Sequence, residues 1–310
     1  MNSQVLEPKL HCSESPLLSE VERLLALLPV SVWAVIVFGN AALHRILIST
    51  LTVWLADVAG GLLQRFLLKR PFPLLRFRGA VLGLLIALLS PSTLPIQLLL
   101  LADLVLVLVL QGLGSEVHFP LSLPAMVGSI LLLFAASRSY PLIFDSEGGK
   151  LLSDLLHAGQ QPSLTVWDML LGRMDGNMGE IASLLLLLGA GYLMVRRRMS
   201  WQIPVAGIVG GALVSYVLAP DTVSIYYYVG AHLLSGGFLL VLLFILSVRN
   251  CAPIGVNAGL LYGALFGVLA IYIRHKTNLD GSLIAALILS LLARPLDRLL
   301  SPQPFGGRLK

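Results

Sequence analysis

The sequence predicts an all-α integral membrane protein, a single membrane domain over residues 1–310 with about ten transmembrane helices. Its residues are 57% hydrophobic and 12% charged, with a mean hydropathy of +0.88. Soluble domains carry about 25% charged residues, and half of that density cannot cover a water-facing surface. The apolar residues also form long runs, such as Leu94 to Leu110, in which Asp103 is the only charge. Ten spans of about 20 residues would use most of the chain and leave no room for a sizeable soluble domain.

Ten apolar segments follow one another along the chain. We place the spans at Leu24–Ala42, Ile46–Phe66, Gly79–Leu89, Leu94–Leu113, Leu123–Ala136, Ile181–Val195, Ile203–Leu218, Tyr226–Val248, Ile254–Ile273 and Gly281–Ala293. The third, fifth and tenth are short for crossing ~30 Å of hydrocarbon. They are either extended by flanking residues or are half-helices that meet a loop inside the bundle.

Basic residues are unevenly divided between the two sets of loops. With residues 1–23 and 294–310 in the cytoplasm, the inside segments hold 15 of the 21 Lys and Arg residues. Cytoplasmic loops of membrane proteins carry such an excess, so we expect both termini in the cytoplasm and a plasma (bacterial inner) membrane location. The same rule explains the net charge of +5 without a nucleic-acid partner. Only the outside cluster of Arg274, His275 and Lys276 fits this topology poorly.

The longest polar segment, residues 137–180, separates five predicted spans (residues 24–136) from five more (residues 181–293). On this topology the segment is an external loop. Because five is odd, two groups of five spans suggest internal repeats of inverted topology. The small-residue openings of the spans after Arg78 and Asn257 are weak sequence echoes of such a repeat.

Two carboxylates and one histidine lie inside the predicted spans. An aspartate at mid-span costs about 2.5–3.5 kcal/mol on insertion scales, so Asp57 and Asp103 are candidates for an ion pathway. His232 lies in the eighth span, shortly before Ser235, Gly236 and Gly237. Each of the three candidates either lines a path for a cation or proton, or is a hydrogen-bonded group that holds helices together.

The most distinctive loop is the end of the external segment, which contains Gly172, Gly176, Gly179 and Glu180. Glycines permit tight turns and exposed amides that can cradle an anion, so these four residues are candidates for cofactor binding. The alternative is a simple turn at the membrane surface, in which Asn177 and Glu180 cap the next helix. The sequence contains no nucleotide-binding, hydrolase or metal-ligand motif, so we expect no metal and no self-contained catalytic residues.

Several segments resemble known motifs in the same order along the chain. Gln111 to Gly114 followed by Leu123 to Gly128 is similar to "GGLG…NPAMVG", Leu170 to Glu180 to "FLGNIPGSIGE", and His232 to Gly237 to "HLLSGA". On these residues the chain resembles the D subunit of the Rnf electron-transport complex and the related B subunit of the sodium-pumping NADH:quinone oxidoreductase. The resemblance implies a membrane subunit that works with other complex subunits in the lipid bilayer. In such complexes electron transfer through FMN or riboflavin is coupled to Na⁺ or H⁺ movement.

The chain also departs from these motifs. The family carries a "SGAT" motif whose threonine holds FMN through a phosphoester bond, whereas Lys150 or Leu151 falls at that position here. Neither side chain forms that bond, so the resemblance implies flavin but we expect no covalent FMN. Two classes of function remain open. One is a divergent electron-transport subunit, and the other is a non-redox transporter or channel on the same inverted-repeat scaffold, with Asp57, Asp103 and His232 along the permeation path.

Overall fold

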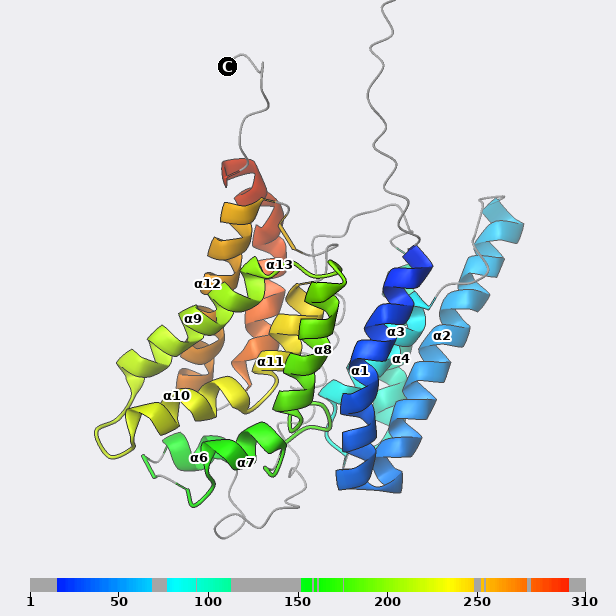
Figure 1. The fold of residues 1–310 in the computed structure, drawn as a ribbon. Helices are drawn as coiled ribbons and strands as arrows, with labels where there is room; N and C mark the ends of the chain where they lie inside the picture. Colours follow the sequence, from blue (N-terminus) through cyan, green and yellow to red (C-terminus); the bar gives the residue numbers. More distant parts are fainter. Residues whose placement is uncertain are drawn as a thin grey trace, which may run out of the picture.

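The computed structural model describes residues 16–68, 77–92, 94–112, 152–157, 159–160, 162–174, 176–247, 252–253, 255–277 and 280–300. All regular structure in these residues is helical (Figure 1). The predicted fifth span, Leu123–Ala136, lies outside the described residues, as do Lys150 and Leu151.

Four helices make up the described part of the first half of the bundle. Helices α1 (Pro16–Phe38) and α2 (Asn40–Leu68) run antiparallel on either side of Gly39, and α3 (Arg78–Leu89) and α4 (Ile96–Gly112) both pack on α2 (Figure 1). Gly39 has a φ of +66°, a conformation that glycine adopts readily and that commonly ends a helix. The tight turn therefore returns the chain directly along α1.

The second half begins with two short helices, α6 (Leu152–His157) and α7 (Val166–Leu171). The helices that follow are α8 (Ser183–Val195), α9 (Gln202–Leu218), α10 (Ile225–Leu234), α11 (Phe238–Leu240) with its π-helical continuation η1 (Val241–Leu246), α12 (Val256–Thr277) and α13 (Gly281–Leu300). Helix α7 packs against α10, which crosses the lower end of the bundle in Figure 1.

The predicted spans that fall within the described residues each overlap a helix, with two differences. The first, predicted as Leu24–Ala42, ends early, because α1 stops at Phe38 and the chain turns at Gly39. The eighth, predicted as continuous from Tyr226 to Val248, is broken at Ser235–Gly237, where α10 and α11–η1 meet at 55°. The physical reason is the backbone of Gly236, whose φ of +64° interrupts the helical path.

Helix length and composition identify three spans that suffice to cross a membrane among the described residues: Leu17–Phe38, Asn40–Leu63 and Val256–Thr277. The bent pair of α10 with α11–η1 adds a fourth if it counts as one span. Helices α3, α4, α8, α9 and α13 contribute shorter apolar stretches. The structure thus supports a multi-pass helical membrane protein, whereas the ten crossings and the inverted repeats remain predictions.

A close helix contact in the second half joins α9 and α12 through small residues. A Cβ added at Gly267 would overlap the backbone of Gly207 and Gly211, and one added at Gly263 would overlap the carbonyl of Ile203. Glycines spaced four apart let membrane helices approach until their backbones touch. Gly259, Gly263 and Gly267 form this type of face on α12.

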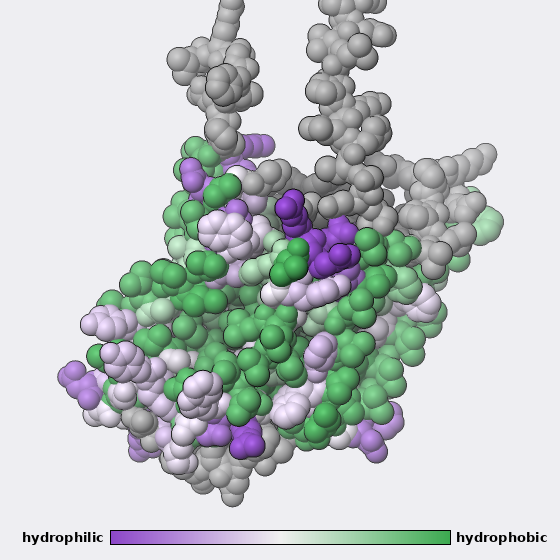
Figure 2. Space-filling view, in the orientation of Figure 1, coloured by the Kyte–Doolittle hydropathy of each residue, from purple (hydrophilic) through white to green (hydrophobic). Residues whose placement is uncertain are grey.

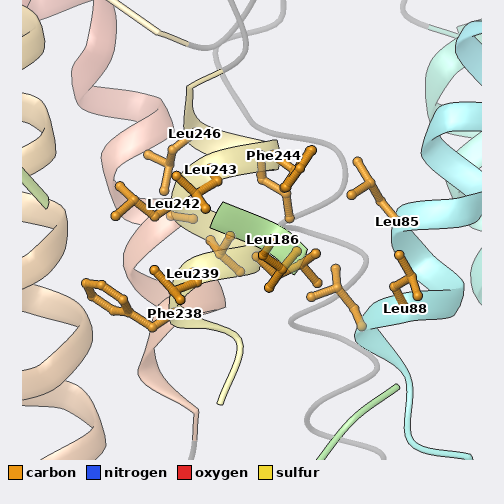
Figure 3. Close-up of a cluster of buried hydrophobic side chains, with 14 of the residues drawn as sticks. Leu85, Leu88, Leu186, Phe238, Leu239, Leu242, Leu243, Phe244 and Leu246 are labelled. Carbon is orange, nitrogen blue, oxygen red and sulfur yellow. The ribbon is translucent and has the colours of Figure 1, made fainter. Parts of the chain in front are cut away.

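One apolar core joins the two halves. Figure 3 shows Leu186 of α8 between the side chains of α11 and η1 on one side and Leu85 and Leu88 of α3 on the other. On the outside, hydrophobic residues cover the middle of the face drawn in Figure 2, and hydrophilic residues gather near its ends. Exposed apolar side chains on α1 and α9 belong to this outer surface, namely Leu25, Leu28, Val32, Ile36, Val205, Val209 and Leu213. A surface of this kind is suited to lipid.

An ion-pair cluster around a buried carboxylate joins α1 to the end of α8. Glu22, which is buried, accepts hydrogen bonds from Arg196 Nη2 at 2.7 Å and from Arg198 Nε. The beginning of α1 and the end of α8 therefore lie at the same end of the bundle. Asp297 similarly accepts a bond from the amide of Gly255 at 3.1 Å, which places the end of α13 beside the start of α12.

Candidate functional site at the break between α10 and α11

Segments that are far apart in the sequence meet at the break between α10 and α11. The amide of Gly179, in the turn before α8, donates to the carbonyl of Leu88 at 2.8 Å near the end of α3. A Cβ at Gly179 would also contact Leu240 of α11. Arg274 of α12 and Asp280, just before α13, reach the same place. The turn before α8, the end of α3, the end of α12 and the start of α13 therefore surround the break.

Arg274 anchors the end of α10. Its Nη1 donates to the carbonyls of His232 at 2.9 Å and Ser235 at 3.1 Å, and its Nη2 donates to Asp280 Oδ1 at 2.7 Å. These carbonyls lie where a helix runs out of intrahelical donors, and the guanidinium satisfies them. Arg274 is only 5% exposed. This explains why it fitted poorly as part of an outside basic cluster with His275 and Lys276, because its side chain points into the bundle.

Asp280 binds the other side of the break. Its Oδ2 accepts from the amide of Gly237 at 3.0 Å, immediately before α11, and from Ser282 Oγ at 2.7 Å. Its Oδ1 also accepts from the amide of Ser282 at 3.3 Å. One carboxylate thus serves the beginnings of α11 and α13, where a negative charge is favoured by the helix dipole.

Glu180 brings a second carboxylate to this place. It is 5% exposed and accepts from Asn177, through the side-chain Nδ2 at 2.5 Å and the backbone amide at 3.2 Å. A Cβ added at Gly237 would meet Asp280 Oδ2 at 2.7 Å, Ser282 Oγ at 3.1 Å and Glu180 Oε1 at 3.3 Å. Side-chain oxygens from two segments, the turn before α8 and the start of α13, therefore surround Gly237.

The three predicted loop glycines are used differently. Gly172 has a φ of +83° at the end of α7, and its amide donates to Met169 O at 3.3 Å. Gly179 donates to Leu88 O, as described above, and a Cβ added at Gly176 would lie 3.5 Å from Glu180 Oε2, in ordinary contact. Amides already bonded to carbonyls do not fit a cradle for a flavin phosphate. The loop positions Glu180 instead.

The beginning of α7 is held by a capping box outside this cluster. Thr165 Oγ1 and the Asp168 carboxylate lie 2.6 Å apart, and the amide of each residue donates to the side chain of the other. The hydrogen bonds from Thr165, aided by Arg173, lower the pKa of the Asp168 carboxyl. Two reciprocal bonds of this kind satisfy amides that a helix start leaves unpaired.

Of the predicted pathway residues, only His232 reaches the break. Its carbonyl binds Arg274, and its ring lies edge-on to Tyr228 with the centroids 4.4 Å apart. Asp57 and Asp103 lie in the first half, on α2 and α4. Asp57 packs against Gly79 of α3, since a Cβ added at Gly79 would lie 2.8 Å from the Cβ of Asp57.

Asp103 is fully buried and belongs to a hydrogen-bond chain. Ser49 Oγ lies 2.8 Å from Asp103 Oδ1 and 2.9 Å from the carbonyl oxygen of Gly83. A hydroxyl carries one hydrogen, so both contacts are hydrogen bonds only if Asp103 donates a proton to Ser49 Oγ. The geometry therefore favours a neutral Asp103 that links α2, α3 and α4.

Sequence reasoning identified Glu180 and His232 but missed Arg274, Asp280 and Ser282 as members of one cluster. The signals were present: Arg274 fitted poorly as a loop residue, and Asp280 precedes an apolar helix that begins with Gly281. What the sequence lacked was the pairing of Asp280 with the amide of Gly237, 43 residues away.

These features define a class of protein, a multi-pass helical membrane protein with a broken helix and buried charges at the break. Such interruptions in membrane proteins occur where the backbone is buried in protein or lines a cavity, and buried charges there mark ion or substrate pathways. The chain belongs to the NQR2, RnfD, RnfE family, whose model matches residues 6–306.

Individual relatives agree with this membership. The chain is 28% identical to the D subunit of the ion-translocating oxidoreductase complex of Methanosarcina acetivorans, with 99% of both chains covered. It is 27% identical to the D subunit of the complex of the same name from Stutzerimonas stutzeri, over 91% of this chain and 90% of that one. It is 30% identical to the B subunit of the Na⁺-translocating NADH-quinone reductase of Pseudomonas aeruginosa, over 56% of this chain and 47% of the relative. The alignment thus spans about half the length of the latter.

Proposed function

We propose that this chain is the D-type membrane subunit of an ion-translocating oxidoreductase complex, in which flavin-mediated electron transfer is coupled to Na⁺ or H⁺ movement across the plasma (bacterial inner) membrane. The observation that carries the proposal is the match to the D subunit from Methanosarcina acetivorans over 99% of both chains. The charged cluster at the break between α10 and α11 supports it, because buried charges at interrupted helices mark ion pathways. The partners would be the other subunits of the complex.

The topology we propose has ten crossings in two inverted groups of five, with both termini in the cytoplasm. The contact of Glu22 with Arg196 and Arg198 supports it, because six crossings would return the chain to the face where α1 begins. On this topology a membrane-impermeant maleimide labels native Cys12 and Cys251 only from the cytoplasmic face. A cysteine introduced at Ser163 should react only from the other face, and labelling of the native cysteines from that face would contradict the topology.

The ion path we propose passes both halves of the bundle. Asp57 and Asp103 would contribute from α2 and α4, and His232 from α10. Asp103 and His232 are buried and Asp57 is half-buried, which supports this role, since ionisable side chains in membrane spans are costly and usually serve function.

Flavin, when bound to such a complex, supplies the electron-transfer chemistry. We propose that this chain holds no covalent FMN, because Lys150 or Leu151 stands where the family has its attachment threonine. The amides of Gly172 and Gly179 do not fit a flavin phosphate, so we assign no step to a flavin at this loop. Glu180 and the glycines around it would act on the ion path instead.

The test is purification of the native complex through an affinity tag on this chain. We expect an NADH-binding iron–sulfur subunit, a second flavoprotein and releasable flavin to co-purify with it. Denaturing gels should show no flavin fluorescence on the band of this chain, and fluorescence there would contradict the absence of covalent FMN alone. If neither flavin nor redox partners co-purify with active material, the electron-transport proposal fails and a non-redox transporter is favoured.

A further inference from the structure

The charges around the break between α10 and α11 do not balance. Glu180 and Asp280 are two carboxylates, and Arg274 is the one guanidinium that contacts either of them in the hydrogen bonds of the described residues. Buried charges persist in proteins only when they are paired. If both carboxylates are ionised, the cluster carries one uncompensated negative charge. A further species of charge +1 beside it would compensate the charge that the described side chains leave unbalanced.

The carboxylate oxygens face a common place. Asp280 Oδ2 and Glu180 Oε1 lie 2.7 Å and 3.3 Å from the position of a Cβ on Gly237, so they are at most about 6 Å apart. Ser282 Oγ lies 3.1 Å from the same position. Oxygen ligands contributed by carboxylates and neutral groups are those that hard cations prefer.

An unused acceptor lies beside this cluster, on the same side-chain amide that binds Glu180. Asn177 is 4% exposed, and its Nδ2 binds Glu180. Its Oδ1 has no hydrogen-bond partner among the described residues, although it is buried. Buried acceptors without a partner are rare in proteins and call for an explanation such as a bound ion or water. Asn177 Oδ1 is thus available to a cation beside Glu180, independently of the charge balance.

The two carboxylates of the cluster, Glu180 and Asp280, limit the charge of the species that can bind between them. No group of three or more His, Cys, Asp or Glu side chains is arranged for a metal ion in the described part of the chain. With one of its two carboxylates already paired with Arg274, the cluster compensates a single positive charge. A monovalent species fits this balance, whereas a divalent metal would leave an excess of positive charge.

The site also lies at depth in the bundle. Helix α8 has 13 residues between Glu180 and the cluster of Arg196, Arg198 and Glu22, a rise of about 20 Å. The hydrocarbon layer is about 30 Å thick. With the arginines at one polar surface, Glu180 lies within the hydrocarbon depth rather than at the opposite surface.

We propose that the break between α10 and α11 binds one monovalent cation, Na⁺ or a proton, between Glu180 and Asp280, with Ser282 Oγ and Asn177 Oδ1 as neutral ligands. The use of this site for translocation rests on the proposed function, whereas the binding itself does not. In the described part of the chain, the other titratable side chains near the break are Tyr228 and His232 on α10 and His275 on α12, and the exposed Lys276 follows on α12.

The test is the thermal stability of the purified complex without any electron donor. One series varies Na⁺ against choline at constant ionic strength, and the other varies pH without Na⁺. A ligand that binds only the folded state raises the unfolding temperature with its concentration. A rise with Na⁺ identifies sodium as the occupant, and a dependence on pH alone identifies a proton. If neither condition has an effect on the wild-type complex, the proposal is overturned.

Variants locate the effect. Glu180→Gln should weaken the apparent affinity at least tenfold, since loss of an outer-shell contact alone costs about 10–100-fold in metal affinity. Asp168→Asn, a carboxyl in the same loop but outside the cluster, should retain the wild-type dependence. An unchanged dependence in Glu180→Gln, or a pH dependence abolished by His232→Gln instead, overturns the proposal.

A milder variant covers the case in which Glu180→Gln fails to assemble. Ser282→Ala keeps both carboxylates and removes one ligand oxygen, so it should weaken a sodium effect several-fold and leave a pH effect in place. A sodium effect that Ser282→Ala does not weaken would place the ion elsewhere and overturn the proposal. Because no electrons flow in these measurements, their failure is distinct from a failure of the proposed electron-transport function.

Discussion

Substitution of Gly267 by alanine tests the close packing of α9 on α12. The added Cβ would overlap the carbonyl oxygen of Gly207 and the amide nitrogen of Gly211. These atoms belong to the backbone and cannot rotate away, so α9 and α12 must separate. Overpacking of this kind costs about 1–3 kcal/mol. Because about 1.4 kcal/mol is a factor of ten, the ratio of folded to unfolded chain should fall by about 5- to 150-fold.

The matched control is Gly259→Ala on the same face of the same helix. A Cβ there would lie 3.6 Å from Ile203 Cγ1 and 3.7 Å from Gln202 Cβ, which is ordinary contact. Both variants replace a helical glycine, so the gain in helix propensity, about 1 kcal/mol, largely cancels between them. The assay is the midpoint of unfolding in mixed micelles of detergent and SDS. Equal midpoints for the two variants would refute the close contact at Gly267.

Three further substitutions test other contacts. Asp103→Asn should remove the infrared carbonyl band of a protonated carboxyl while the complex still assembles; a spectrum in which only a carboxylate band changes would show that Asp103 is ionised. Glu22→Gln should make the complex inactivate faster on heating, because Arg196 and Arg198 lose a buried partner. The control Asp221→Asn, at an exposed turn, should leave the inactivation rate unchanged. Equal inactivation rates for the two variants would exclude a stabilising role for Glu22. Asp57→Asn should slow coupled ion transport in membrane vesicles without reducing assembly, and unchanged transport would leave Asp57 as a packing residue only.

The helices themselves were largely predictable from the sequence. Apolar runs of the required length locate α1, α2 and α12, with helix ends that differ from the predicted ends by up to eight residues, because the hydrophobic pattern decides where a membrane helix forms but not where it stops. The local sequence also explains the turn at Gly39, since only glycine adopts its backbone conformation easily.

The break between α10 and α11 was not predictable in the same way. Ser235, Gly236 and Gly237 suit either close helix packing or a break, and the sequence favours neither. The choice depends on Arg274 and Asp280, which satisfy the backbone groups that the break leaves unpaired. These contacts join residues about 40 positions apart, which local patterns do not encode.

Glu180 was predicted as a site residue for a different reason. The glycines around it suggested an anion cradle, yet two of their amides bind carbonyls and the third glycine lies beside the carboxylate. The type of ligand therefore follows from the partners of Glu180, namely Asn177 and the neighbouring Asp280, rather than from the glycine pattern. A carboxylate pair beside one arginine suits a cation.

The proposed function is tested most directly by coupled transport in vesicles from a strain that lacks this chain. Oxidation of the electron donor and uptake of Na⁺ or H⁺ are measured together, with the wild-type chain or Glu180→Gln restored from a plasmid. The wild-type chain should restore both activities, and Glu180→Gln should restore assembly with little ion uptake. Electron transfer and ion uptake that continue undiminished in the strain without the chain would contradict its assignment as a subunit of the translocating complex.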